Sequence, residues 1–303
     1  MRNLIGLTKR NLLVYFKDKG SIFFSMLTPL IVFILYCVFL KDNFVSAIDE
    51  ASQGLNNMIH SEDLSQLANG ILLTGILGSA FMTVSYNSLM TIVKDRENKI
   101  DYDVSVTPVG RVTIVFSYFL ASTISAFIMS VVILVSGLFL VERQGSMYFQ
   151  FQDYCKLFGI TFLGSLSATA FFMVIVIFFK SSSASGAFMG LLSAVSGFVI
   201  GAYIPISQFS KSVRTVCNLF PATGVTVLLR NGIMGPLMDH INEDLGGIDE
   251  GVFVASMKEA FSFQTSMGDF FLSIRETLFY VMIIFVVCVL AIAVIYPKIY
   301  KRK

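Results

Sequence analysis

The 303-residue sequence contains no tryptophan, only two histidines, four cysteines and six prolines, and charged residues make up only 14% of it. A typical soluble domain has about 25% charged residues and 45–50% apolar residues. This chain is 55% hydrophobic, so it has too few polar side chains to cover one or two soluble domains. Four cysteines in a chain of this length also exclude a disulfide-stabilised scaffold. The composition indicates a polytopic membrane protein.

Motifs for common catalytic and nucleotide chemistry are missing as well. The sequence has no G-x-x-x-x-G-K-[ST] phosphate-binding loop, no H-E-x-x-H, no C-x-x-C and no G-x-S-x-G. His60 and His240 fall in segments expected to be outer loops, without nearby ligand spacing, so no metal site is predicted. We therefore expect that the chain is not an enzyme, binds no cofactor itself and has no nucleic-acid partner.

Six apolar stretches are long enough to cross a bilayer as helices, because a hydrocarbon core about 30 Å thick needs roughly 20 residues. Only Lys156, near the start of the fourth stretch, interrupts them with a charge. We predict an all-α polytopic membrane protein with six transmembrane helices in a single domain over residues 21–303. The predicted spans are 21–40, 71–93, 112–141, 154–179, 186–206 and 277–296, with outer loops over 41–70 and 207–276.

The distribution of Lys and Arg predicts the orientation of these spans. If the N-terminus is cytoplasmic, the inner segments hold fourteen Lys and Arg against five Asp and Glu, a net charge of +9. The outer segments then hold the remaining eight Lys and Arg and fifteen Asp and Glu, a net charge of −7. Because basic segments stay on the cytoplasmic side, we expect both termini to be cytoplasmic. The spans also lack buried carboxylates, which argues against an ion-coupled transporter and leaves the chain without an energy source of its own.

Residues 1–20 have a basic stripe. On a helical wheel, Arg2, Asn3, Lys9, Arg10 and Lys17 share one sector, and apolar residues occupy most of the rest. This pattern predicts an interfacial amphipathic helix whose Lys9, Arg10 and Lys17 face lipid phosphates. An ordinary basic flank of the first span is the alternative interpretation.

The inner loop 94–111 reads KDRENKIDYDVSVTPVGR, with charges that alternate in sign. Asp95, Arg96 and Glu97 could continue the second span as a short solvated helix. Thr107 and Pro108 would end that helix and begin the next one, with the proline near its first turn. Composition leaves two interpretations open for this loop, a solvated connector and a docking surface for a cytoplasmic partner.

The outer segment 207–276 begins half apolar but is broken by Pro221, Gly224 and Gly232. Such a segment predicts a pair of short re-entrant helices that dip into the outer leaflet against protein. The acidic stretch 236–275 that follows is expected to form a small external cap. Cys155 and Cys217 both fall on the outer side and could pair, although nothing in the sequence requires it.

This layout resembles the permease subunit of an ABC exporter of the type-2 membrane-protein class, also called the type V exporter fold. The resemblance covers nearly the whole chain. It rests on the interfacial helix before the first span, on DRE…TPVGR after the second, and on GAYIP…LFPATGVTVLLRNGI after the fifth. In that family the first inner loop forms a coupling helix that docks on the ATPase subunit.

The resemblance implies roles for particular residues. The ATPase contact would be formed or bounded by Asp95, Arg96, Glu97, Thr107 and Pro108. The end of the fifth span and the re-entrant helices that seal the outer side would be marked by Gly201, Pro205 and Pro221.

The resemblance also implies an assembly in a bacterial cytoplasmic membrane. A second permease copy, as a homodimer or a similar heterodimer, would pair with this one above two ABC ATPase subunits that hold ATP and Mg. The cargo moved outward would be amphipathic: a lipid-like molecule, a drug or an antimicrobial peptide. Its path would be lined from spans two and five by Phe81, Met82, Tyr86, Phe188 and Leu192, for which contact with lipid or core is the alternative.

Two other functions remain alternatives. The first is a non-transport membrane sensor or immunity protein that binds a peptide through its outer loops. It would work without any ATPase partner. The second, an intramembrane lipid-modifying enzyme, has no catalytic constellation to support it.

Overall fold

The computed structural model describes residues 2–40, 46, 59, 61–105, 107–246, 251–268 and 270–299. Within these residues the chain is almost entirely helical, and a single antiparallel pair of three-residue strands, β1 (Thr265–Met267) and β2 (Phe270–Leu272), is its only sheet. Six of the described helices are long and apolar enough to cross a membrane. The prediction of an all-α polytopic membrane protein is therefore confirmed.

The six spanning helices agree closely in order and position with the predicted ones. They are α2 (Lys19–Leu35, extended by the π-helical turn η1, Tyr36–Leu40), α4 (Ser61–Glu97), α6 (Arg111–Glu142), α7 (Phe151–Val176), α8 (Ser182–Val199) and α12 (Ile274–Ile299). Shorter elements connect them. These are α1 (Arg2–Lys17), α5 (Ile100–Ser105), η2 (Ile206–Gln208), α9 (Lys211–Asn218), α10 (Pro221–Asp244) and α11 (Val252–Ala260).

Helix α4 is the centre of the bundle and contacts α2, α6, α7, α8 and α10. Its most apolar segment is 89% buried inside the chain, whereas that of α12 is only 17% buried. With 37 residues, α4 is about 55 Å long, nearly twice the thickness of a bilayer core. It begins ten residues before the predicted span, because its first turns, which carry Glu62 and Asp63, are polar and invisible to a search for apolar runs.

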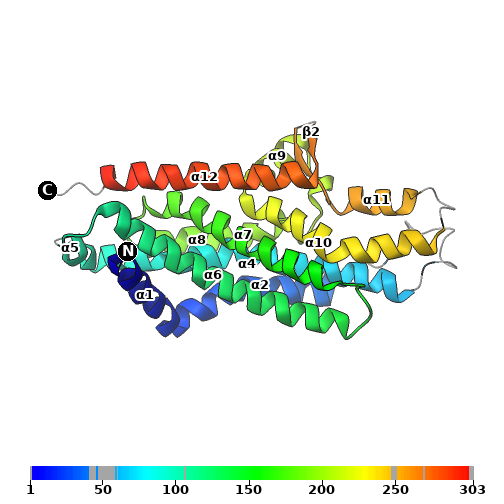
Figure 1. Ribbon diagram of the computed structural model, residues 1–303, viewed down its shortest axis with the longest axis horizontal. Coiled ribbons are helices and arrows are strands. Elements are labelled where there is room, and N and C mark those ends of the chain that lie inside the picture. The colour runs from blue at the N-terminus through cyan, green and yellow to red at the C-terminus, as the bar shows by residue number, and fades with distance from the viewer. Residues whose placement is uncertain are drawn as a thin grey trace.

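Figure 1 places both chain termini at one end of the molecule, together with α1 and α5. We call this the terminal end. The opposite end, which we call the far end, carries α11 and the beginning of α4 (Figure 1). The segment predicted as the outer loop 41–70 is helical from Ser61 onwards, as the beginning of α4 at the far end. Most of residues 41–60 fall outside the described residues.

Helices α9 and α10 are separated by a short break and bent by 91° relative to each other. Pro221 is the first residue of α10, where a missing backbone N–H costs no hydrogen bond. Helix α10 is buried against α4, α7 and α12. This geometry suits the expected re-entrant pair, whose depth in the bilayer stays a prediction. The described residues of 236–275, which were expected to form an external cap, form the last turns of α10, then α11 and the β1–β2 hairpin, and their position outside the membrane stays a prediction.

Two sequence-based expectations about side chains can be compared directly with the structure. Cys155 is exposed, Cys217 is buried and both are free, so the pairing left open by the sequence does not form here. His240 lies within α10 rather than in a loop. The other histidine of the chain, His60, lies outside the described residues.

Candidate functional site

An ion pair joins α1 to the last turns of α4 at the terminal end. Arg10 donates both terminal guanidinium nitrogens to the carboxylate of Asp95, with Nη2 2.9 Å from Oδ1. The hydroxyl of Tyr118, on α6, donates to Oδ2 of the same carboxylate at 2.5 Å. Asp95 is only 3% exposed, so its charge is balanced at a site nearly closed to solvent. Hydrogen bonding to Asp95 raises the pKa of Arg10, which therefore stays charged.

A second polar contact lies one residue earlier on α4. Lys94 donates to Oδ2 of Asp18 at 2.6 Å, and the same aspartate caps α2 by accepting the backbone N–H of Ser21 at 3.0 Å. The hydrogen bond from Lys94, reinforced by Ser21, lowers the pKa of Asp18 well below its usual range. Asn11 of α1 adds a hydrogen bond of 3.2 Å to Ser117 of α6. These contacts fix α1 to α2, α4 and α6.

The next two residues of α4 contact the turn between α7 and α8. Arg96 donates Nη1 to the carbonyl oxygens of Ile177, at 3.0 Å, and Phe179. Glu97 accepts the backbone N–H of Ser182 at 3.1 Å. Four consecutive residues, Lys94 to Glu97, thus join the end of α4 to α2, α1, α6 and the α7–α8 turn. A displacement at this point reaches every one of those elements.

The segment after α4 is the exposed part of the terminal end. Tyr102, on α5, is 67% exposed, and Asp103, Thr107 and Pro108 are exposed as well. Helix α6 begins at Arg111 rather than at Pro108, because Gly110 has the extended backbone of an N-cap residue. Figure 1 shows α5 protruding beyond the ends of the neighbouring helices.

The structure places all five predicted coupling residues at the terminal end but divides them into two groups. Asp95 and Arg96 make contacts inside the chain, and Asp95 is an internal ion-pair partner rather than part of a docking surface. Glu97, Thr107 and Pro108 are exposed, and their contact with an ATPase stays a prediction. The basic stripe of α1 is divided likewise. Lys9 and Lys17 are exposed, whereas Arg10 turns towards Asp95 because a buried carboxylate needs a cation.

The predicted wall of the cargo path lies in the core of the chain. Phe81, Met82 and Tyr86 have 0% exposure, and Leu192 is buried too. The hydroxyl of Tyr86 lies 2.8 Å from Oγ of Ser185, and its ring contacts that of Phe188, with 5.3 Å between ring centroids. In this conformation these residues are part of the packed core, where Tyr86 also contacts Phe172 of α7 with 5.8 Å between ring centroids. A role in lining a cargo path stays a prediction.

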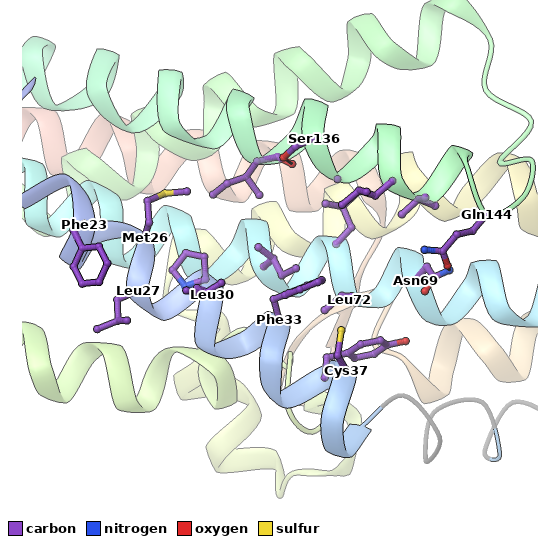
Figure 2. A pocket seen from close by; sticks show the side chains of 18 residues that line it. Phe23, Met26, Leu27, Leu30, Phe33, Cys37, Asn69, Leu72, Ser136 and Gln144 are labelled. Carbon is purple, nitrogen blue, oxygen red and sulfur yellow. Dashed lines mark hydrogen bonds between the residues drawn. The ribbon is translucent and has the colours of Figure 1, made fainter. Parts of the chain in front are cut away.

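An apolar cavity of about 570 Å³ lies elsewhere, between α2, α4 and α6 (Figure 2). Phe23, Met26 and Phe33 of α2 line it, with Leu72 of α4 and Ser136 of α6. This volume is within the range of small-molecule sites, roughly 300–1,000 Å³. The sequence reasoning missed this cavity because apolar residues on three helices look alike until the helices are packed.

The cavity has one polar end. Nδ2 of Asn69 donates to Oε1 of Gln144 at 3.1 Å, and Figure 2 shows this amide pair at the opposite end from Phe23. The signals that could have located the cavity are Ser136 and Gly137, a polar and a small residue in the third span. A Cβ at Gly137 would come within 2.1 Å of Leu73 on α4, so the two helices approach closely there.

Arg230 has the largest fully buried side chain among the described residues. Its Nη1 donates to the carbonyl oxygens of Phe261, at 2.8 Å, and Ser262, at 3.3 Å. Its Nη2 donates to those of Gly201, at 2.8 Å, and Ile200, at 3.2 Å. The four hydrogen bonds join α10 to the end of α8 and to the segment after α11. Sequence reasoning missed this residue, although a lone arginine inside the apolar run VTVLLRNGIM was the signal.

Of the three predicted outer-gate residues, Gly201 contacts this arginine, and Pro205 and Pro221 lie at the beginnings of η2 and α10. Gly201 has φ of +70°, and a Cβ there would lie 2.8 Å from Cγ1 of Ile206, so glycine is required. The same left-handed residue ends α8 at Val199, before the predicted boundary at 206. Pro205 precedes η2 and Pro221 opens α10. Their role in sealing one side stays a prediction.

The fold and these contacts define a multi-pass membrane protein built around one central helix. The family described as ABC-2 family transporter protein matches residues 45–295. The chain therefore belongs to this family of transport permeases, and the resemblance seen in the sequence is confirmed. Membership implies association with an ABC ATPase subunit and a transport component that is generally not catalytic itself. A comparison with curated proteins found no match.

Proposed function

We propose that this chain is the membrane-spanning subunit of an ATP-driven exporter in a bacterial cytoplasmic membrane. A separate ATPase subunit, with ATP and Mg, docks at its terminal end, and two such subunits serve a pair of permease chains. The excess of basic residues in the segments at the terminal end supports a cytoplasmic location for it. The cargo that this exporter moves outward is amphipathic or lipid-like.

One observation carries the docking proposal. The exposed segment of α5 and the following turn, with Tyr102, Asp103, Thr107 and Pro108, is continuous with the four residues that cross-connect the end of α4. A partner that pushes on this segment would move α4, α1 and the α7–α8 turn together. A loop that only connected two spans would not need the hydrogen bonds that join the last four residues of α4 to α2, α1 and the α7–α8 turn.

The cavity between α2, α4 and α6 supports an amphipathic cargo. The described residues that line it include no Asp, Glu, Lys or Arg, so they offer no fixed charge for an ion. Its apolar length suits an acyl chain or another hydrocarbon body. The amide pair of Asn69 and Gln144 supplies hydrogen-bonding groups for a polar head at one end.

The docking proposal is tested with the chain and its co-purifying ATPase subunit reconstituted in liposomes. The double variant Tyr102→Ala/Asp103→Asn is expected to lose the ATPase subunit and the vanadate-sensitive ATP hydrolysis that depends on it. Glu259→Gln, which changes an exposed carboxylate on α11 at the far end, is the matched control. Full biological activity of the chain without any P-loop ATPase would instead favour a sensor or immunity protein.

The cargo is tested with a photoactivatable phospholipid in the same liposomes. Ser136 lines the cavity and is exposed, so the indole of Ser136→Trp should occupy part of the cavity and reduce labelling of α2 and α6 as well as ATP-dependent lipid movement. Val132→Trp, one turn earlier on α6 and exposed outside the cavity lining, should leave both unchanged. Equal labelling in the two variants would contradict the assignment of the cavity to cargo.

A further inference from the structure

Three side chains that can ligate metals meet at the far end, away from the cavity and the coupling residues. Asp63 lies in the first turn of α4, and His240 and Asp244 lie one turn apart near the end of α10. One ligand atom from each lies within 4.8 Å of the others, and Nε2 of His240 is 3.3 Å from Oδ2 of Asp244. The sequence analysis did not predict this cluster because it placed His240 in a loop. Only in a helix do His240 and Asp244, four residues apart, lie on the same face.

We propose that Asp63, His240 and Asp244 bind a zinc ion. One imidazole and two carboxylates form a nitrogen and oxygen donor set that zinc accepts, with water in the fourth position. Two ligands at 2.0–2.1 Å from a tetrahedral zinc lie about 3.3 Å apart. The separation of the His240 and Asp244 atoms already equals that edge, and only the Asp63 carboxylate needs to turn inwards.

The surroundings of the three ligands favour a bound cation. The ring of Tyr148 packs on the imidazole of His240 with 3.8 Å between centroids, which limits rotation of the imidazole. Asp63 is only 6% exposed, so packing restricts the movement of its carboxylate. Asp63 and Asp244 bring two carboxylates to the same imidazole, with one ligand atom of each of the three side chains within 4.8 Å of the others. A divalent cation would offset this concentration of negative charge.

A buried amide on the next turn of α4 has no hydrogen-bond partner among the described residues. Gln66, one turn after Asp63, is fully buried, and within the described part of the chain neither of its amide atoms has a hydrogen-bond partner. Buried polar groups are nearly always satisfied, so an unsatisfied amide points to an ordered water or ion nearby.

Binding would join the start of α4 to the end of α10 at the far end. This consequence does not depend on the ATPase or on the cargo, so it can be tested on the chain alone. The protein is purified in lipid nanodiscs through an affinity tag without histidine, stripped with EDTA and titrated calorimetrically with ZnCl₂. We expect one zinc per chain, and an affinity that falls roughly tenfold or more in His240→Ala and Asp63→Asn.

Asp239→Asn is the matched control, because Asp239 is an exposed carboxylate adjacent to His240 and outside the cluster. It should bind zinc like the wild type. Zinc should also raise the thermal transition of the wild type and of Asp239→Asn but not that of His240→Ala. If His240→Ala fails to fold, Asp244→Asn replaces it, since Asp244 is exposed. Absence of binding by the wild type, or undiminished binding by these ligand variants, would overturn the proposal.

Discussion

Arg10 and Asp95 are 85 residues apart in the sequence, yet the guanidinium of one and the carboxylate of the other form a two-point ion pair where α1 meets α4. Tyr118 donates a third hydrogen bond to the same carboxylate. Because Asp95 is nearly closed to solvent, removal of its cation leaves a poorly solvated charge. This pair therefore contributes to the attachment of α1 to the bundle, together with the hydrogen bond from Asn11 to Ser117.

Substitution of Arg10 by alanine should lower the free energy of unfolding by about 2–3 kcal/mol, less than for a fully buried pair because Arg10 is 34% exposed. The double variant Arg10→Ala/Asp95→Asn should recover part of this loss, since the uncompensated charge is then absent. Lys9→Ala, an exposed neighbour, is the control. The chain has no tryptophan, so thermal unfolding is best followed by size-exclusion chromatography of a fluorescent fusion. Equal transitions for Arg10→Ala and Lys9→Ala would contradict a structural role for the pair.

The contact between Asp18 and Lys94 predicts a dependence on pH. The pKa of Asp18 is lowered in the folded chain, so the contact stabilises the fold above the unfolded-state pKa, about 3.9, and this stabilisation is lost as the pH falls towards the folded-state pKa. Asp18→Asn should therefore be less stable than the wild type at pH 7. The difference should shrink progressively below about pH 4. A difference that stays constant between pH 7 and pH 3, measured by the same chromatographic assay, would exclude this linkage.

Replacement of Arg230 by lysine, which keeps the positive charge but not the guanidinium group, should destabilise the fold. A lysine ammonium is compact and cannot donate to four carbonyl oxygens on two separate segments. We expect Arg230→Lys to lose about 2–4 kcal/mol of stability, because buried carbonyl groups lose their donors. Chymotrypsin should then cleave faster near Phe261 and Phe263. Arg275→Lys, at an exposed position on α12, should be cleaved like the wild type.

The class of fold followed from the sequence because membrane insertion is a local property of each segment. A run of about 20 apolar residues crosses a bilayer whatever its neighbours are, so all six spans could be predicted. The extension of α4 to Ser61 could not, since its polar turns are held by contacts with other helices rather than by hydropathy.

The site was predictable only in part, for a related reason. The inner loop carried an unusual number of charges, and the structure places this loop at the terminal end, where its contact with an ATPase stays a prediction. The direction in which each side chain points depends on partners far away in the sequence, such as Arg10 for Asp95 and Phe261 for Arg230. For the same reason, the His240 cluster became visible only when α10 was placed beside α4.

The length of α4 has a mechanical consequence. The helix contains no proline, is enclosed by five others and extends well past the thickness of a bilayer core. Such a rod acts as a lever, so a tilt of about 5° at the Lys94–Glu97 end would displace a tip about 55 Å away by about 5 Å. A movement of the terminal end of α4 would thus be transmitted across the membrane to the far end, while the helix itself keeps its conformation.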